Sequence, residues 1–250
     1  GLEIHGVESV TLDVRDPTAV SRRLDGAQFD AVVDLVSFTP SQVEQTFEVL
    51  GATTRQYVFV SSATVSTAAP SNGVITEESP LVNAGWNYPI LKAESEARLH
   101  QLGKSRGYDY TIVRPYITYS EQRIAFGLWE GDQVLGRLQR GLPILLVDEI
   151  ASARTSLTHA YDFAAGLVAL IGQPDALNET FQIASPEQIT WKEVFELSAR
   201  TLGFDIDLQI IAKGEFLKAW PGLAGKVEDR AMDRAFSADK LSRVVNGFDF

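Results

Sequence analysis

The chain of 250 residues is long enough to bury a sizeable core, and its 45% hydrophobic and 22% charged residues are ordinary for a globular protein. A formal net charge of −11 disfavours a nucleic-acid binder, because an acidic surface repels a phosphate backbone. With no cysteine and only three histidines, the sequence excludes disulfides and thiolate chemistry and disfavours a metal centre. No apolar run reaches the ~18–20 residues that span a bilayer, so we expect a cytoplasmic protein with no membrane partner.

Short apolar runs alternate with segments of helical spacing in the first half of the chain. Buried strands are predicted over residues 7–12, 31–36, 57–60 and 110–113. Helices are predicted over residues 18–24, 41–50 and 86–107. This alternation favours an α/β fold with a doubly wound parallel sheet, in which the loops after the strands carry the ligand site.

The regular alternation ends after Ser120. Helices are predicted over residues 129–140, 161–171, 190–202 and 237–244, the third of them with a capping box from Thr190 and Glu193. Strands are predicted over residues 144–147, 180–183 and 207–211. We interpret residues 1–172 as the domain that contains the doubly wound sheet, with an insertion near 121–150, and residues 173–250 as a smaller α+β lobe that binds substrate.

Tyr88 and Lys92 are four residues apart near the start of a predicted helix, which places the phenol and the ammonium on one face. A neighbouring cation favours phenolate and lowers the pKa of a phenol, so the pair is suited to proton exchange with a substrate hydroxyl. The same spacing also fits a surface pair on an amphipathic helix. Ser62 follows a predicted strand, where it can complete a Ser-Tyr-Lys set or cap a turn.

Several segments resemble, in order and spacing, successive motifs of the extended short-chain dehydrogenase/reductase family. They are Val58 to Val65, Ile75 to Leu81, Tyr88 to Lys92, Thr111 to Pro115, Arg154 to Ala164 and Phe236 to Leu241. The chain looks most similar to the NAD-dependent epimerases and dehydratases, in particular to nucleotide-sugar epimerases and their atypical relatives from polysaccharide gene clusters.

This resemblance implies a Rossmann-like domain and an enzyme that uses NAD or NADP to act on a nucleotide-linked sugar. It implies that Tyr88 is the acid/base, that Lys92 holds the nicotinamide ribose, and that Ser62 binds the reacting oxygen. The expected cofactor-binding residues are Asp13, Leu35, Val36, Ser37, Ser61, Tyr88, Lys92 and Pro115. The expected substrate-binding residues are Ser62, Thr64, Tyr116, Arg154 and Arg234.

Two of these assignments have alternatives. Arg154 matches a family arginine that grips the substrate pyrophosphate, and a planar guanidinium suits phosphate oxygens, but an isolated loop arginine also fits a solvated surface. Arg230 and Arg234 are weaker candidates for the same task, because their alternation with acidic residues is typical of a solvated helix face.

The sequence departs from the family pattern in two places. The family opens with a glycine-rich turn that Gly1 and Gly6 do not form, so we expect that the first strand-helix-strand unit is missing from this sequence, and we favour omitted N-terminal residues. Ala63-Thr64 follow Ser62 where the family's dehydratases carry an Asp-Glu pair, which disfavours dehydration. Epimerisation and ketone reduction both stay open, as does the choice between NAD and NADP.

The resemblance also implies a homodimer, in which residues 41–50 and 86–107 pair with their mates as a four-helix bundle and bury apolar outer faces. A noncatalytic dinucleotide-binding scaffold of the same fold is the alternative function, and it gains weight if the glycine-rich unit is truly missing. An RNA-associated relative is a third possibility, against which the net charge argues.

Overall fold

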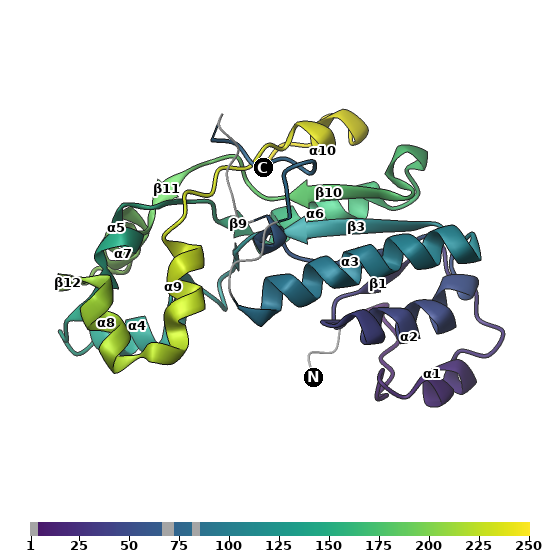
Figure 1. Ribbon diagram of the computed structural model, residues 1–250, viewed down its shortest axis with the longest axis horizontal. Helices are drawn as coiled ribbons and strands as arrows, with labels where there is room; N and C mark the ends of the chain where they lie inside the picture. The colour runs from purple at the N-terminus through teal and green to yellow at the C-terminus, as the bar shows by residue number, and fades with distance from the viewer. Residues whose placement is uncertain (1–4, 67–72, 82–85) are drawn as a thin grey trace.

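A parallel four-stranded sheet forms the centre of the larger part of the molecule (Figure 1), as the computed structural model of residues 5–66, 73–81 and 86–250 describes it. Its strand order is β1-β2-β3-β10. The strands are β1 (Val32–Asp34), β2 (Tyr57–Val60), β3 (Tyr110–Pro115) and β10 (Glu179–Ile183). All three strand pairings are parallel, which confirms the expected Rossmann-like α/β class.

Helices cover both faces of this sheet (Figure 1). On one face α2 (Pro40–Leu50) and α3 (Asn87–Arg106) pack over Tyr57 and Phe59. On the other face α6 (Ala160–Leu170) and α10 (Asp239–Val244) pack over Val58 and Val60. The alternating residues of β2 thus serve two cores, because successive side chains of a strand point to opposite faces. None of the described helices is both long and apolar enough to cross a membrane.

Capping residues set the helix boundaries close to those the sequence predicts. Thr39 and Gln42 form a capping box at the start of α2, and Thr190 and Glu193 form the expected one at the start of α7 (Trp191–Leu202). At the other end of α3 the chain turns at Gly107, whose φ of 70° favours glycine.

The strand expected over residues 7–12 is wrong. The described chain has no strand there, and Val7 and Val10 are exposed. The first helix or strand of the described chain is therefore α1 (Pro17–Arg23), which Asp16 caps and which matches the helix predicted over residues 18–24. Within the described sheet, β1 pairs only with β2 on one side, so residues 7–12 have no neighbouring strand to satisfy their backbone groups.

A second hydrophobic core, around Trp191, Phe126, Phe195 and Phe216, belongs to a smaller lobe. Its remaining helices and strands are β5 (Ala125–Phe126), β6 (Trp129–Glu130), α4 (Gly131–Leu138), β7 (Ile144–Val147), α5 (Asp148–Ser152), β8 (Arg154–Thr155), β11 (Ile189–Thr190), β12 (Leu208–Ile211), α8 (Lys213–Ala219) and α9 (Ala224–Arg230). The short parallel pair of β4 (Thr118–Tyr119) and β9 (Thr158–His159) lies against α6 instead. The expected insertion near 121–150 lies in the smaller lobe, and β7 pairs with β12 in parallel.

The domain boundary expected between residues 172 and 173 does not match this arrangement. Strand β10 pairs with β3 in the main sheet, and Leu241 of α10 packs in the core beneath it. The smaller lobe is therefore assembled from two stretches of chain, one before α6 and one after β10, because its core draws side chains from both.

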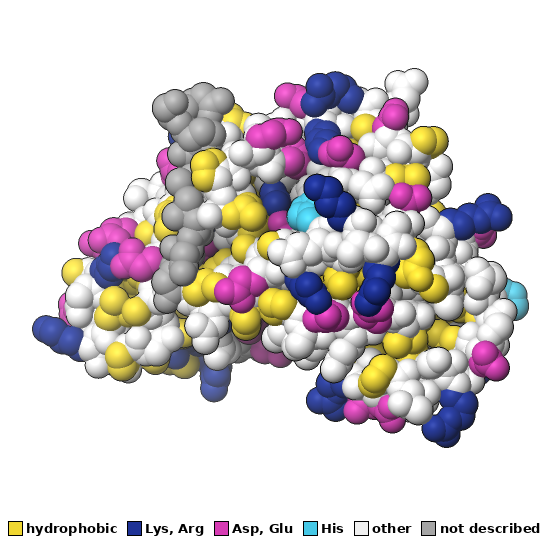
Figure 2. Space-filling view, turned by 45° about the vertical axis from the view of Figure 1, so that its right-hand side comes forward, with side chains coloured by type: hydrophobic (Ala, Val, Ile, Leu, Met, Phe, Trp, Pro, Cys, Tyr) yellow, Lys and Arg dark blue, Asp and Glu magenta, His cyan; other side chains and the backbone are white. Residues whose placement is uncertain are grey.

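The exposed faces of α2 and α3 carry ion pairs where the sequence predicts apolar surfaces. Arg98 pairs with Glu44 and Arg106 with Glu48, and Figure 2 shows basic side chains adjoining acidic ones on this side of the molecule. Among the described residues, none of the large exposed hydrophobic side chains lies on either helix. The homodimer stays a prediction, and its expected apolar interface is not present on these helices.

The contact between α3 and β3 gives a stability prediction. A Cβ atom at Gly103 would lie 2.2 Å from Cε1 of Tyr110, whose ring is held by a 2.6 Å hydrogen bond to His100. We expect Gly103→Ala to lower the free energy of unfolding by about 1–3 kcal/mol, although alanine favours helix. Gly136→Ala in α4 is the control, because its Cβ would meet only a flexible Arg140 atom at 3.4 Å. Urea unfolding measures the free energy of unfolding of both variants. A Gly103→Ala variant as stable as the wild type would contradict the prediction.

Candidate functional site

A cavity of about 490 Å³ lies between the carboxyl ends of the main-sheet strands and the smaller lobe. Ser62 and Thr64, which follow β2, line it and are almost completely buried. The Ser62 hydroxyl accepts a hydrogen bond from the Thr64 backbone N–H at 3.3 Å and lies 2.8 Å from the Thr64 hydroxyl. Ser62 therefore caps a turn, as one alternative from the sequence has it, and also presents its oxygen to the cavity.

Tyr88, in the first turn of α3, lines the same cavity as Ser62. The Trp86 and Phe38 rings flank its ring, with centroids 5.5 Å and 6.3 Å away. Burial raises the pKa of Tyr88, while the Ser62 side chain and the charge of Arg230 oppose that rise. The expected lowering of this pKa by Lys92 is therefore not found, and Tyr88 is a neutral phenol at neutral pH.

Lys92 lies one helical turn beyond Tyr88 and is only 2% exposed. Its Nζ donates to the carbonyl oxygens of Ser37 and Val60, each at 2.8 Å, and sits 4.7–4.8 Å from the centroids of the Phe38 and Phe59 rings. Since an ammonium group has three N–H donors, one is left without an acceptor among the described residues. Burial lowers the pKa of Lys92 to about 8.

Most of the expected cofactor-binding residues lie along the carboxyl ends of β1 to β3. Leu35 and Val36 form an apolar shelf after β1, with side chains 59% and 53% exposed. Ser61 follows β2 and is buried, with its hydroxyl unpaired among the described residues. Pro115, the last residue of β3, lines the cavity. The structure thus brings these residues to one edge of the sheet.

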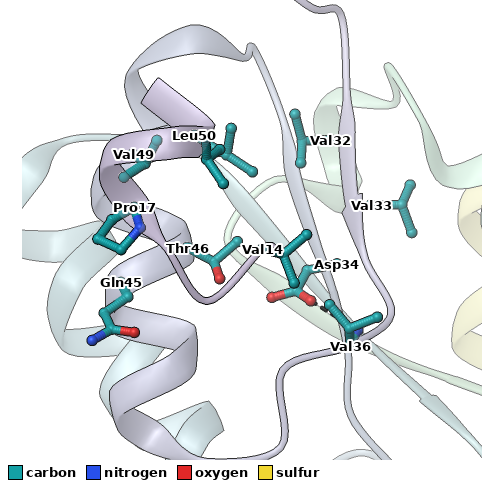
Figure 3. Close-up of a pocket in the computed structure, with 11 residues that line it drawn as sticks. Val14, Pro17, Val32, Val33, Asp34, Val36, Gln45, Thr46, Val49 and Leu50 are labelled. Atoms are coloured by element: carbon teal, nitrogen blue, oxygen red, sulfur yellow. Dashed lines mark hydrogen bonds between the residues drawn. The ribbon is translucent and has the colours of Figure 1, made fainter. Parts of the chain in front are cut away.

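Asp13 lies apart from this group, on the exposed chain before α1. Its carboxylate accepts hydrogen bonds from Arg15 at 3.0–3.1 Å, which lower its pKa. A small slot of about 110 Å³ opens beside it, lined by Val14, Val36 and Thr46 (Figure 3). Asp13 itself does not line the slot.

The two arginines that the resemblance assigns to substrate binding do not line the cavity. Arg154 is exposed and lies 3.5 Å from the Asp233 carboxylate. Arg234 is 1% exposed, and its guanidinium binds the buried Asp229 carboxylate at 2.5 Å and the carbonyl oxygen of Ser66. Arg234 is therefore part of the protein interior. It lies neither in the cavity, as a substrate-binding residue would, nor on a solvated helix face.

Other cations line the cavity instead. Lys226 and Arg230 of α9 face it, as does Arg123, which lies 3.7 Å from Glu130. Lys226 makes no ion pair among the described residues, and Arg230 contacts Asp229 while its Nε is buried and unpaired there. Neither Lys226 nor Arg123 was expected from the sequence, although the four-residue spacing of Lys226 from Arg230 indicates a shared helix face.

Two contacts place α9 against the rest of the cavity wall. Tyr116 is buried, packs on Phe236 at a centroid distance of 4.9 Å, and has the Arg230 guanidinium 5.9 Å from its ring centroid. At the start of α9, Gly225 lies so close to Trp86 that a Cβ there would be 2.6 Å from the Trp86 Cβ. Helix α9 is thereby held against Trp86 and Tyr116, which line the same cavity.

The different placements of the two arginines predict different stability effects. Replacing Arg234 by methionine leaves Asp229 with only Arg230 as its cation, so we expect a loss of about 3 kcal/mol in the free energy of unfolding. Arg154→Gln removes an exposed pair and should cost less than about 1 kcal/mol. Equal losses of stability in urea unfolding of the two variants would contradict the placement of Arg234 in the interior and of Arg154 on the surface.

Solved structures of several enzymes share this fold. The chain aligns with TM-scores of 0.75, 0.71 and 0.73 to dTDP-glucose 4,6-dehydratase from Streptomyces venezuelae with NAD bound, UDP-glucose 4-epimerase from Thermus thermophilus in complex with NAD, and RMD from Pseudomonas aeruginosa complexed with NADPH. These alignments cover 95–96% of this chain and 72–82% of the others, at 15–18% identity. At such identity they show the fold alone.

A curated protein, 2'-dehydrokanamycin reductase from Streptomyces kanamyceticus, is 27% identical over 213 residues. That match covers 79% of this chain and 55% of the reductase, so the chain spans about half the length of this relative. Residues 2–184, which include the main-sheet strands together with Ser62, Tyr88 and Lys92, match the NAD dependent epimerase/dehydratase family. The chain therefore belongs to the NAD dependent epimerase/dehydratase family.

Proposed function

We propose that the protein is an NAD(P)-dependent epimerase or ketone reductase of a nucleotide-linked sugar. The observation that carries the proposal is a cluster of three side chains: Ser62 and Tyr88 line one cavity, and Lys92 is buried one helical turn behind Tyr88. A hydroxyl and a phenol that meet in a cavity are suited to bind a substrate oxygen and transfer a proton to it.

The residues along the sheet edge fit one side of a bound dinucleotide. Leu35 and Val36 offer an exposed apolar shelf, Lys92 has a spare N–H donor, and the buried Ser61 hydroxyl has no partner among the described residues. Ligands of doubly wound sheets bind at this edge, outside the carboxyl ends of the strands. We assign these residues to an NAD or NADP molecule, whose nicotinamide supplies hydride transfer when bound.

The chain's own residues supply the proton and the geometry. Because burial keeps Tyr88 protonated at neutral pH, its phenol donates a proton to a substrate carbonyl oxygen, and Ser62 holds that oxygen from the second side. Lys92, charged below about pH 8, stabilises the phenolate that Tyr88 leaves behind. In the reverse direction Tyr88 would accept the proton of a substrate hydroxyl, while a bound oxidised dinucleotide would accept the hydride, and epimerisation needs both directions.

Two features of the cavity limit the class of substrate and reaction that we propose. In a chain of net charge −11, Lys226, Arg230 and Arg123 gather on one cavity, which supports a ligand that carries phosphate groups. Next to Ser62, Ala63 and Thr64 offer no carboxyl group to assist the elimination of water. We therefore favour epimerisation or ketone reduction over dehydration.

Tyr88→Phe tests the proposed chemistry. We expect turnover of a nucleotide-linked keto sugar, followed by NADH or NADPH absorbance, to fall at least about 100-fold because the proton donor is gone. Dinucleotide affinity, measured by fluorescence titration, should stay within a few-fold. Tyr161→Phe is the matched control, because Tyr161 is 74% exposed on α6.

Undiminished turnover in the Tyr88→Phe variant would remove Tyr88 from the mechanism. A wild-type protein that binds the dinucleotide but turns over none of a panel of nucleotide-linked sugars would support the noncatalytic scaffold instead.

The charge of the α9 wall gives a separate test of the substrate class. We expect Lys226→Gln to weaken the binding of uridine or thymidine diphosphate several-fold in calorimetric titration, because the variant removes a cavity cation that has no ion-pair partner among the described residues. Lys218→Gln makes the same change of net charge on α8, outside the cavity, and should leave affinity unchanged. Equal affinities of the two variants would contradict a phosphate site at α9.

A further inference from the structure

Asp34, the last residue of β1, is an ionisable side chain that the proposed reaction does not use. It is 4% exposed. Its Oδ1 accepts hydrogen bonds from the backbone N–H groups of Val36 and Ser37, both at 3.0 Å, and its Oδ2 accepts one from the Tyr57 hydroxyl at 2.6 Å. All of these donors are neutral, so the buried carboxylate has hydrogen bonds but no ion pair within the part of the chain that the structure describes.

Ser37 joins this carboxylate to Lys92. Its N–H donates to Asp34, while its carbonyl oxygen accepts the hydrogen bond from Lys92 Nζ at 2.8 Å. The turn that Asp34 holds is therefore one of the two carbonyl supports of the ammonium group. Figure 3 shows Asp34 beside this turn, with its hydrogen bond to Val36.

The other charged group on the helix face of Lys92 already has a partner. Glu96 lies one turn further along α3, and its two oxygens accept hydrogen bonds of 2.9 Å and 2.6 Å from the Arg114 guanidinium of β3. That pair is buried and has no net charge. On the other side Tyr88 is a neutral phenol, and from β2 the Tyr57 hydroxyl reaches Asp34 alone.

We infer that Asp34 is the counter-charge and positioning residue of Lys92, and that it keeps the buried ammonium protonated and fixed on the Ser37 carbonyl oxygen. Opposite charges attract strongly in a buried setting, where water does not screen them. The direction of the Lys92 pKa agrees: burial lowers it, whereas Asp34, followed by Glu96, raises it back to about 8.

The consequence for catalysis rests on the proposed function. If Lys92 supports Tyr88 as a cation, then Asp34 determines the pH above which that support is lost. The charge coupling itself does not depend on catalysis, and it is measurable in the protein without substrate or dinucleotide.

The experiment is an NMR titration of the Lys92 side chain in protein with ¹³C-labelled lysine, with the resonance assigned from a Lys92→Met variant. In the wild type we expect a midpoint near pH 8. Asp34→Asn keeps an oxygen for the two backbone donors but removes the charge, and should lower the midpoint by about 1 pH unit. Asp34→Ser is a second neutral variant, whose hydroxyl can accept from the same turn if the asparagine variant does not fold.

Two controls separate charge from structure. Asp34→Glu restores the negative charge and should bring the midpoint back toward the wild-type value. Asp30→Asn removes an exposed carboxylate that lies 3.5 Å from Arg55, and should leave the midpoint unchanged. A folded neutral variant of Asp34 with the wild-type midpoint overturns the inference, as does an Asp34→Glu midpoint as low as that of Asp34→Asn.

The pH profile of turnover is the second readout. In Asp34→Asn we expect the alkaline limb of kcat/KM to move to lower pH together with the Lys92 midpoint, with most of the activity recovered below that midpoint. A shifted midpoint in a protein without any turnover would contradict the proposed function but leave the charge coupling intact. An unshifted midpoint would overturn the coupling whatever the activity.

Discussion

The burial of one ammonium group governs the arrangement of the whole sheet edge. Removing a charged lysine from water costs several kcal/mol unless hydrogen bonds and opposite charge replace the lost hydration. For Lys92 those replacements come from two segments: the turn after β1, with the Ser37 carbonyl and the Phe38 ring, and β2, with the Val60 carbonyl and the Phe59 ring. The position of α3 over the sheet, and with it the position of Tyr88, is tied to satisfying this one charge.

The molecule also separates its charges by location. The chain has a net charge of −11, yet the cavity is lined by three basic side chains against one acidic side chain, Glu130, and α9 supplies two of the three cations. A long-range field that repels anions is thus combined with a short-range attraction inside a partly enclosed space, where charges interact more strongly than in water. Such an arrangement favours ligands whose negative charge can enter the cavity over extended polyanions.

Much of the fold was predictable from local sequence patterns. The strands of the main sheet are short apolar runs, and the helices begin at capping boxes such as Thr190 with Glu193, so their boundaries follow from nearby residues alone. The meeting of Ser62 with Tyr88 follows from the strand order of a doubly wound sheet once the helix is placed. The predictions of strands and helices succeeded because each depends on a few consecutive residues.

The predictions that failed concern residues whose structural partners are distant in the sequence. Residues 7–12 resemble a short apolar strand in sequence, but a strand needs a neighbour that the described sheet does not provide. Arg234 looks like a solvated helix arginine in sequence, and only the fold shows that Asp229 and the Ser66 carbonyl enclose it. The pKa of Tyr88 was predicted from a neighbouring charge, whereas burial decides its direction. Asp34 reads as an ordinary strand residue until Ser37 and Lys92 are seen together.

The close packing of Gly225 against Trp86 has an evolutionary consequence. Because no side chain separates α9 from the start of α3, a Cβ at Gly225 would lie 2.6 Å from the Trp86 Cβ, and the two segments would have to move apart. Lys226 and Arg230 of α9 and Trp86 all line the cavity, so one substitution at Gly225 would change the shape of the cavity. Such a change leaves the side chains of Ser62, Tyr88 and Lys92 unaltered in sequence, so the outline of the cavity and this cluster are free to diverge independently.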